Sequence, residues 1–340
     1  MKAEVAFYRR LEEKNVKCEV CPHNCRIKPG KRGICRVRVN LDGTLYATNY
    51  GEYSSLAVDP IEKKPLYHFY PGWNILSVGT VGCNFSCGFC QNYRIAHEDA
   101  PTRFLSPDEL LRLAEECRSR GSIGVAYTYS EPLMWYEYLR DVLPVIKEGG
   151  FKNVLVTNGY INQGPLEEIL PHIDALNIDL KSFSAGFYRS HCRGRLEPVK
   201  ETIKLCAGRT HVEVTTLLIT GLNDTPKEIE ELSQWIAGID PSIPLHLSAY
   251  FPAYKVSLPP TSRATMTMAR EVAGRNLNYV YVGNMAGFDN DTLCSHCRAL
   301  LVTRQGYRIR LENLDGDRCA VCGQTAPLVN EKKEGFDHQT

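Results

Sequence analysis

The sequence is best interpreted from a short apolar run that leads into a loop with three cysteines. It reads Ile75-Leu76-Ser77-Val78-Gly79-Thr80-Val81-Gly82-Cys83-Asn84-Phe85-Ser86-Cys87-Gly88-Phe89-Cys90. The apolar run predicts a buried strand. The cysteines have the spacing Cx3Cx2C, with no fourth cysteine nearby. Three thiolates from one compact loop can bind three irons of a [4Fe-4S] cluster and leave the fourth iron open to a cosubstrate. The alternative is a zinc knuckle or a set of unrelated buried cysteines.

Further apolar runs, each followed by a polar loop and an amphipathic stretch, predict a series of β/α units. Several runs are apolar at consecutive positions, as in strands that are buried on both faces. About six or seven units predict an α/β fold, either a doubly wound sheet or an incomplete (β/α) barrel, with ligands at the carboxyl ends of the strands. The expected strands are 75–79, 123–127, 153–156, 175–180, 212–218, 245–248 and 279–282.

Two segments carry clear signals for the start of a helix. Ser106-Pro107-Asp108-Glu109 is a capping box with proline at the first helical position, and Thr225-Pro226-Lys227-Glu228 repeats the pattern. Residues 132–147 are also predicted to be helical. We expect Pro144 to kink or shorten that helix.

Three more loops follow expected strands, and together with the cysteine loop they resemble the radical S-adenosylmethionine (SAM) enzymes. Tyr127-Thr128-Tyr129-Ser130-Glu131-Pro132 matches the Glu-Pro half of that family's Gly-Gly-Glu-Pro motif, which receives the SAM amino group. Val156-Thr157-Asn158-Gly159 and Asn177-Ile178-Asp179-Leu180-Lys181 resemble segments of the glycyl-radical-enzyme activases. Val156 replaces an aspartate that helps to bind a monovalent cation in those activases. The resemblance implies an incomplete (β/α) barrel of the radical SAM type.

A narrower resemblance is to the AmmeMemoRadiSam system radical SAM enzymes, which are related to the pyruvate formate-lyase activating enzymes. The matching runs are 59–66, 218–224, 246–252 and 279–284. The resemblance implies that Cys83, Cys87 and Cys90 are the catalytic cluster ligands. It also implies SAM contacts, which we expect among Phe89, Ser130, Glu131, Thr157, Asp179, Lys181 and His246. His246 has a simpler alternative, a hydrogen-bonded core histidine. Asp179 and Lys181 also have one, an ion pair at the surface end of their strand.

This resemblance implies an oxidoreductase that cleaves SAM reductively to a 5′-deoxyadenosyl radical, which abstracts hydrogen from a substrate. A protein glycyl group is one target; a small metabolite or RNA is the alternative. A reducing protein such as flavodoxin or ferredoxin is an expected partner, and a protein substrate or pathway partners are further candidates. A hypothesis from another class is a non-catalytic, metal-rich electron carrier or scaffold.

Two further cysteine groups flank the predicted core. Cys294, Cys297, Cys319 and Cys322 form two CxxC knuckles separated by 21 residues, which is typical of a zinc ribbon. A rubredoxin-like iron site and a group without metal are the alternatives. Residues 299–311 between them are expected to form a hairpin. Cys18, Cys21, Cys25 and Cys35 form the other group, where zinc and an auxiliary iron–sulfur cluster both fit and zinc is narrowly favoured.

Near the N-terminal group, His23 is a candidate ligand or a hydrogen-bond partner of one. The same region has a basic patch, which is also what an ordinary solvated loop surface would carry. The patch comprises Arg26, Lys28, Lys31, Arg32, Arg36 and Arg38.

Composition agrees with a globular, metal-binding protein. The 340 residues are 43% hydrophobic and 23% charged, with 40 basic and 39 acidic side chains. Because the net charge is +1, we do not expect nucleic acid as a partner, and we expect neither a membrane span nor an export signal. We therefore expect a cytoplasmic protein whose 14 cysteines are reduced, with Cys117, Cys192 and Cys206 as buried or spectator thiols. The expected divisions are 1–50 (metal-binding), 51–287 (core), 288–329 (zinc-ribbon-like) and 330–340 (flexible tail).

Overall fold

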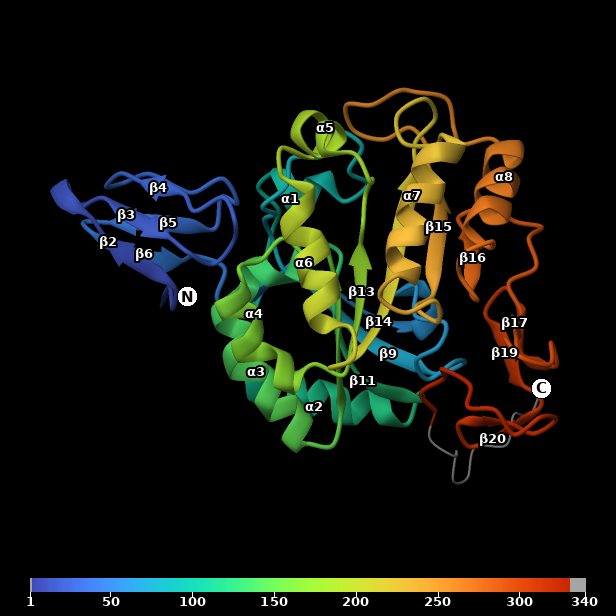
Figure 1. Cartoon of the computed structure of the whole chain (residues 1–340). Helices are drawn as coiled ribbons and strands as arrows, with labels where there is room; N and C mark the ends of the chain where they lie inside the picture. Colours follow the sequence, from blue (N-terminus) through green and yellow to red (C-terminus); the bar gives the residue numbers. More distant parts are fainter. Residues whose placement is uncertain (1, 331–340) are drawn as a thin grey trace.

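A computed structural model describes residues 2–330, and its centre is one eight-stranded sheet (Figure 1). The strand order is β16-β15-β14-β13-β12-β11-β9-β8. Every pair from β9 to β16 is parallel, and β8 joins β9 in the antiparallel sense. Within residues 2–330, β8 and β16 form the two edges of this sheet, so the barrel is incomplete, as the sequence predicted.

All seven expected core strands are present. The central residues of these strands are almost completely buried. Helices cover the outer face of the sheet, and side chains of the other strands cover the inner face. The strands of this sheet are β8 (Ser55–Pro60), β9 (Asn74–Gly79), β11 (Ser122–Tyr127), β12 (Lys152–Thr157), β13 (Ala175–Asp179), β14 (His211–Leu218), β15 (Leu245–Ala249) and β16 (Val280–Gly283).

One main helix follows each parallel strand from β9 to β15, which is the expected β/α order. The predicted capping box forms at Ser106 and Glu109. At the second start only half of the pattern forms: the Thr225 side chain accepts from the Glu228 backbone N–H, whereas the Glu228 carboxylate accepts from Phe183 N at 2.9 Å. The expected shortening at Pro144 is wrong, because the helix continues to Glu148. These helices are α2 (Pro107–Arg118), α3 (Tyr136–Glu148), α4 (Gln163–Ile169), α6 (Leu196–Cys206), α7 (Pro226–Ala237) and α8 (Arg263–Ala273).

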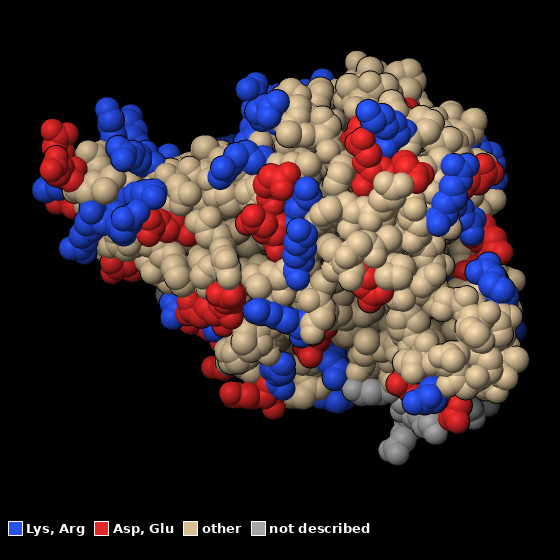
Figure 2. Space-filling view, viewed as in Figure 1, with Lys and Arg blue, Asp and Glu red and all other residues tan. Residues whose placement is uncertain are grey.

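Two small antiparallel sheets precede the core and lie beside it in Figure 1. One contains β1 (Ala3–Glu4), β6 (Thr44–Ala47) and β5 (Arg38–Leu41), and the other contains β2 (Tyr8–Arg10), β3 (Val16–Cys18) and β4 (Arg26–Ile27). Figure 2 shows many lysine and arginine side chains on this part of the molecule.

The expected basic patch needs one correction. Arg26, Lys28, Lys31 and Arg32 are exposed, but Arg38 is 1% exposed and pairs with Glu137 of α3 at 2.8 Å. The carboxylate of Glu137, 99 positions further along the chain, offsets the cost of burying the Arg38 charge.

The C-terminal segment forms a third small sheet from β17 (Thr292–Leu293), β18 (Leu300–Gln305) and β19 (Arg308–Leu311), followed by a β20 (Leu314–Asp315) and β21 (Arg318–Cys319) pair. The predicted hairpin is confirmed as β18 and β19. Arg304 fixes this segment to the core, since its guanidinium donates to the Tyr67 carbonyl at 2.7 Å and lies over the Tyr67 ring.

The remaining short elements lie on loops around the core. They are α1 (Tyr93–His97), α5 (Ala185–Phe187) and the β7 (Glu52–Tyr53) and β10 (Arg103–Phe104) pair. None of the helices in residues 2–330 has the length and apolar character needed to cross a membrane. Except for Asn330, the predicted flexible tail falls outside the described residues.

Candidate functional site

A cavity of about 350 Å³ lies at the carboxyl ends of the parallel strands, where the fold places ligands. Loops after β9, β11, β12 and β13 contribute most of its wall. Thr215 and Leu217 of β14, Ser248 of β15 and Asn284 just after β16 also line it. All three cysteines of the first loop line this cavity. Six of the seven expected SAM contacts join them: Phe89, Ser130, Glu131, Thr157, Asp179 and Lys181.

The cysteine loop is held against the core by short hydrogen bonds. The Asn84 side chain donates to the Tyr160 carbonyl at 2.7 Å and accepts from the Asn158 side chain at 2.8 Å. The same Asn158 amide lies 3.7 Å from Cys83 Sγ. Asn158 therefore links the loop after β12 to the first cysteine of the loop after β9.

Cys192, expected to be a spectator, is completely buried and contacts Cys87. Its side chain and the loss of water raise the pKa of the Cys87 thiol well above the ordinary range. A metal would have to bind its sulfur for the thiolate to persist at neutral pH.

Glu131 contributes a buried carboxyl group to the cavity. It precedes a 3-10 helix, Pro132–Trp135, and its carboxylate accepts hydrogen bonds from Leu133 N at 3.1 Å, Thr157 Oγ1 at 2.6 Å and Asn158 N at 2.8 Å. Burial raises the pKa of Glu131 to about 7, although these hydrogen bonds oppose the shift. A cationic ligand would restore the charged form of the carboxylate.

Asp179 and Lys181 meet at the end of β13. Their side chains form an ion pair of 2.9 Å and also line the cavity, where Asp179 is 35% and Lys181 18% exposed. Burial lowers the pKa of Lys181, but the Asp179 carboxylate outweighs this and raises it well above the usual value. The pair therefore presents opposite charges to one ligand site.

His246 is not brought to this cavity. It is buried on β15, and its Nε2 lies 2.6 Å from Glu213 Oε2 on β14. Glu213 also contacts His211 Nε2 at 2.9 Å and accepts the backbone N–H of His68 at 2.7 Å. The position fits the alternative of a hydrogen-bonded core histidine.

Sequence reasoning missed one group on the cavity wall, which contains Lys63, Lys64 and Tyr129. Lys64 Nζ lies 2.8 Å from Asp59 Oδ2 and 4.9 Å from the centre of the Tyr129 ring, and Tyr129 donates its hydroxyl to the same carboxylate at 2.8 Å. Burial opposes ionisation of Asp59, but Lys64 lowers its pKa to about 2. The signal available in the sequence was the matching run 59–66, which holds both lysines.

Tyr129 also has a strained backbone, with φ of +69°. It occupies a position where the Gly-Gly-Glu-Pro motif has glycine, the residue that adopts this conformation without cost. The hydrogen bond to Asp59 and the contact with Lys64 therefore stabilise a conformation that tyrosine disfavours.

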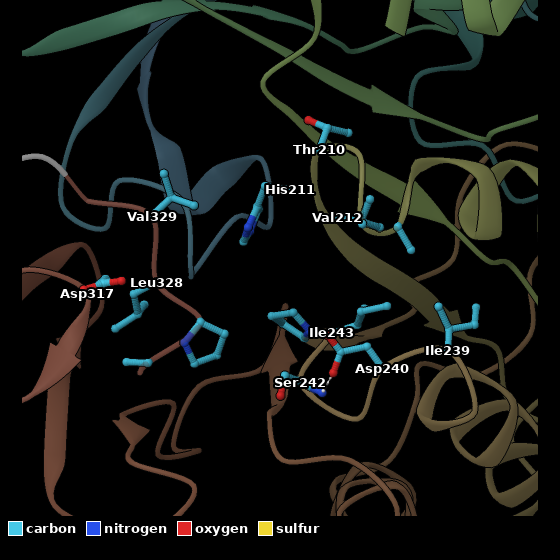
Figure 3. A pocket seen from close by; sticks show the side chains of 15 residues that line it. Thr210, His211, Val212, Ile239, Asp240, Ser242, Ile243, Asp317, Leu328 and Val329 are labelled. Atoms are coloured by element: carbon cyan, nitrogen blue, oxygen red, sulfur yellow. Dashed lines mark hydrogen bonds between the residues drawn. The ribbon is translucent and has the colours of Figure 1, made fainter. Parts of the chain in front are cut away.

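A second cavity, of about 450 Å³, lies at the amino end of β14 (Figure 3). Thr210, His211 and Val212 face Leu328 and Val329 across it. Its described lining contains no cysteine and none of the expected SAM contacts. The chemistry predicted from the sequence therefore belongs to the cavity at the carboxyl ends.

The two flanking cysteine groups both assemble in space. In the C-terminal group the Sγ atoms of Cys294 and Cys322, and those of Cys297 and Cys319, lie 3.7 Å apart, and all four lie within 4.8 Å of one another. Cys18, Cys21, Cys25 and Cys35 line one apolar pocket with Arg38 and Met134. His23 lies at this pocket, but its Nε2 is 2.7 Å from the Asn84 carbonyl oxygen.

The comparisons with known proteins agree with the main cavity. The model of the family described as the radical SAM superfamily matches residues 77–236, which includes the cysteine loop. An uncharacterized protein of Methanocaldococcus jannaschii is 41% identical over 336 residues, which cover 96% of this chain and 99% of that protein. The chain belongs to the radical SAM superfamily. Membership implies a [4Fe-4S] cluster and SAM, and the three cysteines and the polar groups beside them fit both.

More distant radical SAM relatives have named activities. The pyruvate formate-lyase-activating enzyme of Clostridium pasteurianum is 26% identical over 162 residues, covering 46% of this chain and 67% of that enzyme. A probable GTP 3′,8-cyclase of Methanosarcina mazei is 25% identical over 254 residues, covering 66% and 72%. Streptococcus suis SuiB bound to S-adenosylmethionine has the same fold, with a TM-score of 0.51, 15% identity and coverage of 64% and 50%.

Proposed function

We propose that this radical SAM enzyme binds its [4Fe-4S] cluster through Cys83, Cys87 and Cys90 and abstracts a hydrogen atom from a substrate in the cavity beside them. One observation carries the proposal: these three cysteines and six of the residues expected to contact SAM line the same cavity. When bound and reduced, the cluster and SAM supply a 5′-deoxyadenosyl radical.

The protein's own groups would orient SAM. The Glu131 carboxylate is placed to accept the SAM amino group, since it is buried, anionic when paired and fixed by three donors. Asp179 and Lys181 offer a carboxylate and an ammonium to the other polar groups of SAM. Phe89, Ser130 and Thr157 complete the contacts, and the buried wall keeps water away from the reacting centre.

The target we propose is a glycyl group in a protein, as in the activating enzymes that this chain resembles. The rim of the cavity supports a polypeptide substrate. After β15, Phe251 is 46% exposed, and Tyr254 stacks on Tyr93 with ring centres 4.5 Å apart. The same loop touches the cysteine loop, because Lys255 N donates to Gly88 O at 2.8 Å. Exposed aromatic side chains beside an opening are typical of surfaces that bind other proteins.

A second candidate target is a nucleotide-like metabolite. It is favoured by the relatives named as GTP 3′,8-cyclases and by the two lysines on the cavity wall, which could bind phosphate. RNA is a third target to be included in the test. In each case a one-electron donor of the flavodoxin or ferredoxin type would reduce the cluster.

Deuterium transfer identifies the target class. Cell extract grown with deuterated precursors is separated into protein, RNA and small-molecule fractions, and each is incubated with the reduced enzyme and SAM. We expect deuterium in 5′-deoxyadenosine from the protein fraction. Deuterium transfer from the RNA or the small-molecule fraction alone would contradict the protein target and identify that fraction as the source of the substrate. An enzyme that cleaves no SAM under reduction would overturn the catalytic proposal and favour the electron carrier or scaffold.

We also propose that Cys294, Cys297, Cys319 and Cys322 bind structural zinc. Four thiolates at about 2.3 Å from one tetrahedral ion lie about 3.8 Å apart. The two 3.7 Å contacts between sulfur atoms support this assignment. Zinc would stabilise a small segment that has only a few buried apolar residues of its own.

A further inference from the structure

The N-terminal cysteines form a site of a different kind from the C-terminal ones. Cys18 ends β3, Cys21 and Cys25 lie in the following turn, and Cys35 lies just before β5. Cys18, Cys21 and Cys35 are 6 to 7% exposed. Their pocket is otherwise mostly apolar, with Val20, Ile27, Ile34 and Met134 among its lining. Such a pocket excludes water, and it leaves the four sulfurs as the principal ligand atoms.

The separation of the sulfur atoms distinguishes the sites. Within residues 2–330, only the C-terminal group brings three or more ligand atoms within 4.8 Å of one another. The N-terminal sulfurs share a pocket but do not converge in this way. A single zinc ion needs four sulfurs about 3.8 Å apart. Thiolates that bind different irons of one cluster stand further apart, because the cluster lies between them.

The cysteines of the main cavity provide an internal reference. Cys83, Cys87 and Cys90 also line one cavity without converging within 4.8 Å, and radical SAM membership implies that they hold a [4Fe-4S] cluster. The N-terminal group therefore resembles the main-cavity group in one respect, since no three of its sulfurs lie within 4.8 Å of one another. It does not share the spacing of the group that fits zinc.

A buried cation faces the N-terminal pocket. Arg38 lines it, and the Nε and Nη1 atoms of this side chain have no hydrogen-bond partner among the described residues. Its Nη2 pairs with Glu137 Oε2 at 2.8 Å. A buried guanidinium with unused N–H groups indicates an anionic acceptor in the pocket. A cluster with four thiolate ligands is such an anion, and its sulfides add hydrogen-bond acceptors.

We propose that Cys18, Cys21, Cys25 and Cys35 bind a second [4Fe-4S] cluster, with Arg38 donating hydrogen bonds to it. This assignment replaces zinc, which the sequence analysis narrowly favoured at this group. With four cysteine ligands this cluster has no open iron, so SAM does not bind to it. The site adjoins the main cysteine loop through the contact between His23 and Asn84. The Cys35 carbonyl oxygen also lies close to the main cysteine loop, because a methyl group added at Gly82 would come within 2.8 Å of it.

The metal content of the full chain tests this proposal without any substitution. Protein reconstituted anaerobically with iron and sulfide should contain about eight irons, about eight sulfides and about one zinc. A content of about four irons, about four sulfides and about two zincs would overturn it and restore zinc at the N-terminal group.

A variant separates the two clusters. The triple variant Cys83→Ala, Cys87→Ala and Cys90→Ala should retain about four irons and give, after reduction, an electron paramagnetic resonance signal that SAM does not change. Further substitution of Cys21→Ala and Cys35→Ala should remove that iron while about one zinc stays. Cys117→Ala in the full chain serves as the matched control. A triple variant that folds but holds no cluster would overturn the proposal, whereas failure of SAM cleavage in the full chain would overturn only the catalytic one.

Discussion

The N-terminal and C-terminal cysteine groups have the same number of thiols but differ in three-dimensional arrangement and in surroundings. The C-terminal sulfurs touch in pairs at 3.7 Å and lie in a segment with a small core. The N-terminal sulfurs stand apart in an apolar pocket, face the buried Arg38 and join the main core cluster of apolar residues. Under the two assignments proposed above, four cysteines alone do not distinguish the metals. The distances between the sulfurs and the charge around them do.

The largest effect is expected from loss of a C-terminal ligand. Cys297→Ala should lower zinc from about one per chain to near zero and unfold residues 289–329, because binding a structural zinc contributes about 10 kcal/mol or more to modules of this kind. Hydrogen exchange and zinc analysis measure the result. Iron at the N-terminal group should not change, and Cys117→Ala should leave both metals in place. If the segment stays protected without zinc, the contrast between the two sites is wrong.

The next effect concerns the buried charge at the N-terminal site. Arg38→Met removes one partner of a buried ion pair and should lower the free energy of unfolding by about 3 to 5 kcal/mol. Arg112→Met removes an exposed partner, since Arg112 and Glu116 are 62% and 56% exposed, and should cost at most about 1 kcal/mol. Urea unfolding under anaerobic conditions compares the two. Equal losses would mean that Arg38 does not stabilise the N-terminal site.

A smaller effect is expected in the main cavity. Asp179→Asn or Lys181→Met should weaken SAM binding or uncouple its cleavage by about ten- to a hundredfold, because misalignment of about 1 Å is enough for such a loss. Calorimetric titration with SAM and measurement of 5′-deoxyadenosine report it. Iron and zinc at the two outer groups should stay unchanged. Normal affinity and cleavage in both variants would remove the pair from the SAM site.

The smallest effect concerns Tyr129. Tyr129→Gly relieves a left-handed backbone conformation that costs about 1 to 2 kcal/mol, but it removes the hydrogen bond to Asp59 and the ring beside Lys64. The two changes should nearly cancel, so the free energy of unfolding should change by about 1 kcal/mol or less. Tyr129→Phe keeps the strain and loses only the hydroxyl, and it should destabilise the protein by about 1 kcal/mol. A Tyr129→Gly protein much less stable than Tyr129→Phe would show that the contacts of the ring outweigh the backbone strain.

The sequence predicted those features that depend on neighbouring residues. Consecutive apolar residues identified the core strands, Ser106 and Thr225 identified two helix starts, and the loop motifs identified the residues of the main cavity. Their signals are local, because a strand, a cap or a loop ligand is set within about ten residues.

The features that the sequence did not predict depend on distant partners. His246 is held by Glu213, 33 positions away, and Arg38 is buried because Glu137 lies 99 positions further on. Lys64 lies on the cavity wall beside the ring of Tyr129, 65 positions further along the chain. Pro144 is tolerated inside α3 and does not end it. No window of the sequence contains such pairs, so only the folded chain can show them.

The contact between the C-terminal segment and the loop before β9 has a consequence for biosynthesis. Val329 pairs with Phe69, and the His68 ring binds the carbonyl of Pro327, 259 positions later in the chain. A ribosome makes the loop long before it makes its partner. The core is therefore synthesised while this loop has no partner. The N-terminal cysteines leave the ribosome first and can bind metal before the C-terminal segment is made. Synthesis that stops before Val329 would leave a chain with its N-terminal cysteines present and the loop before β9 without its C-terminal partner.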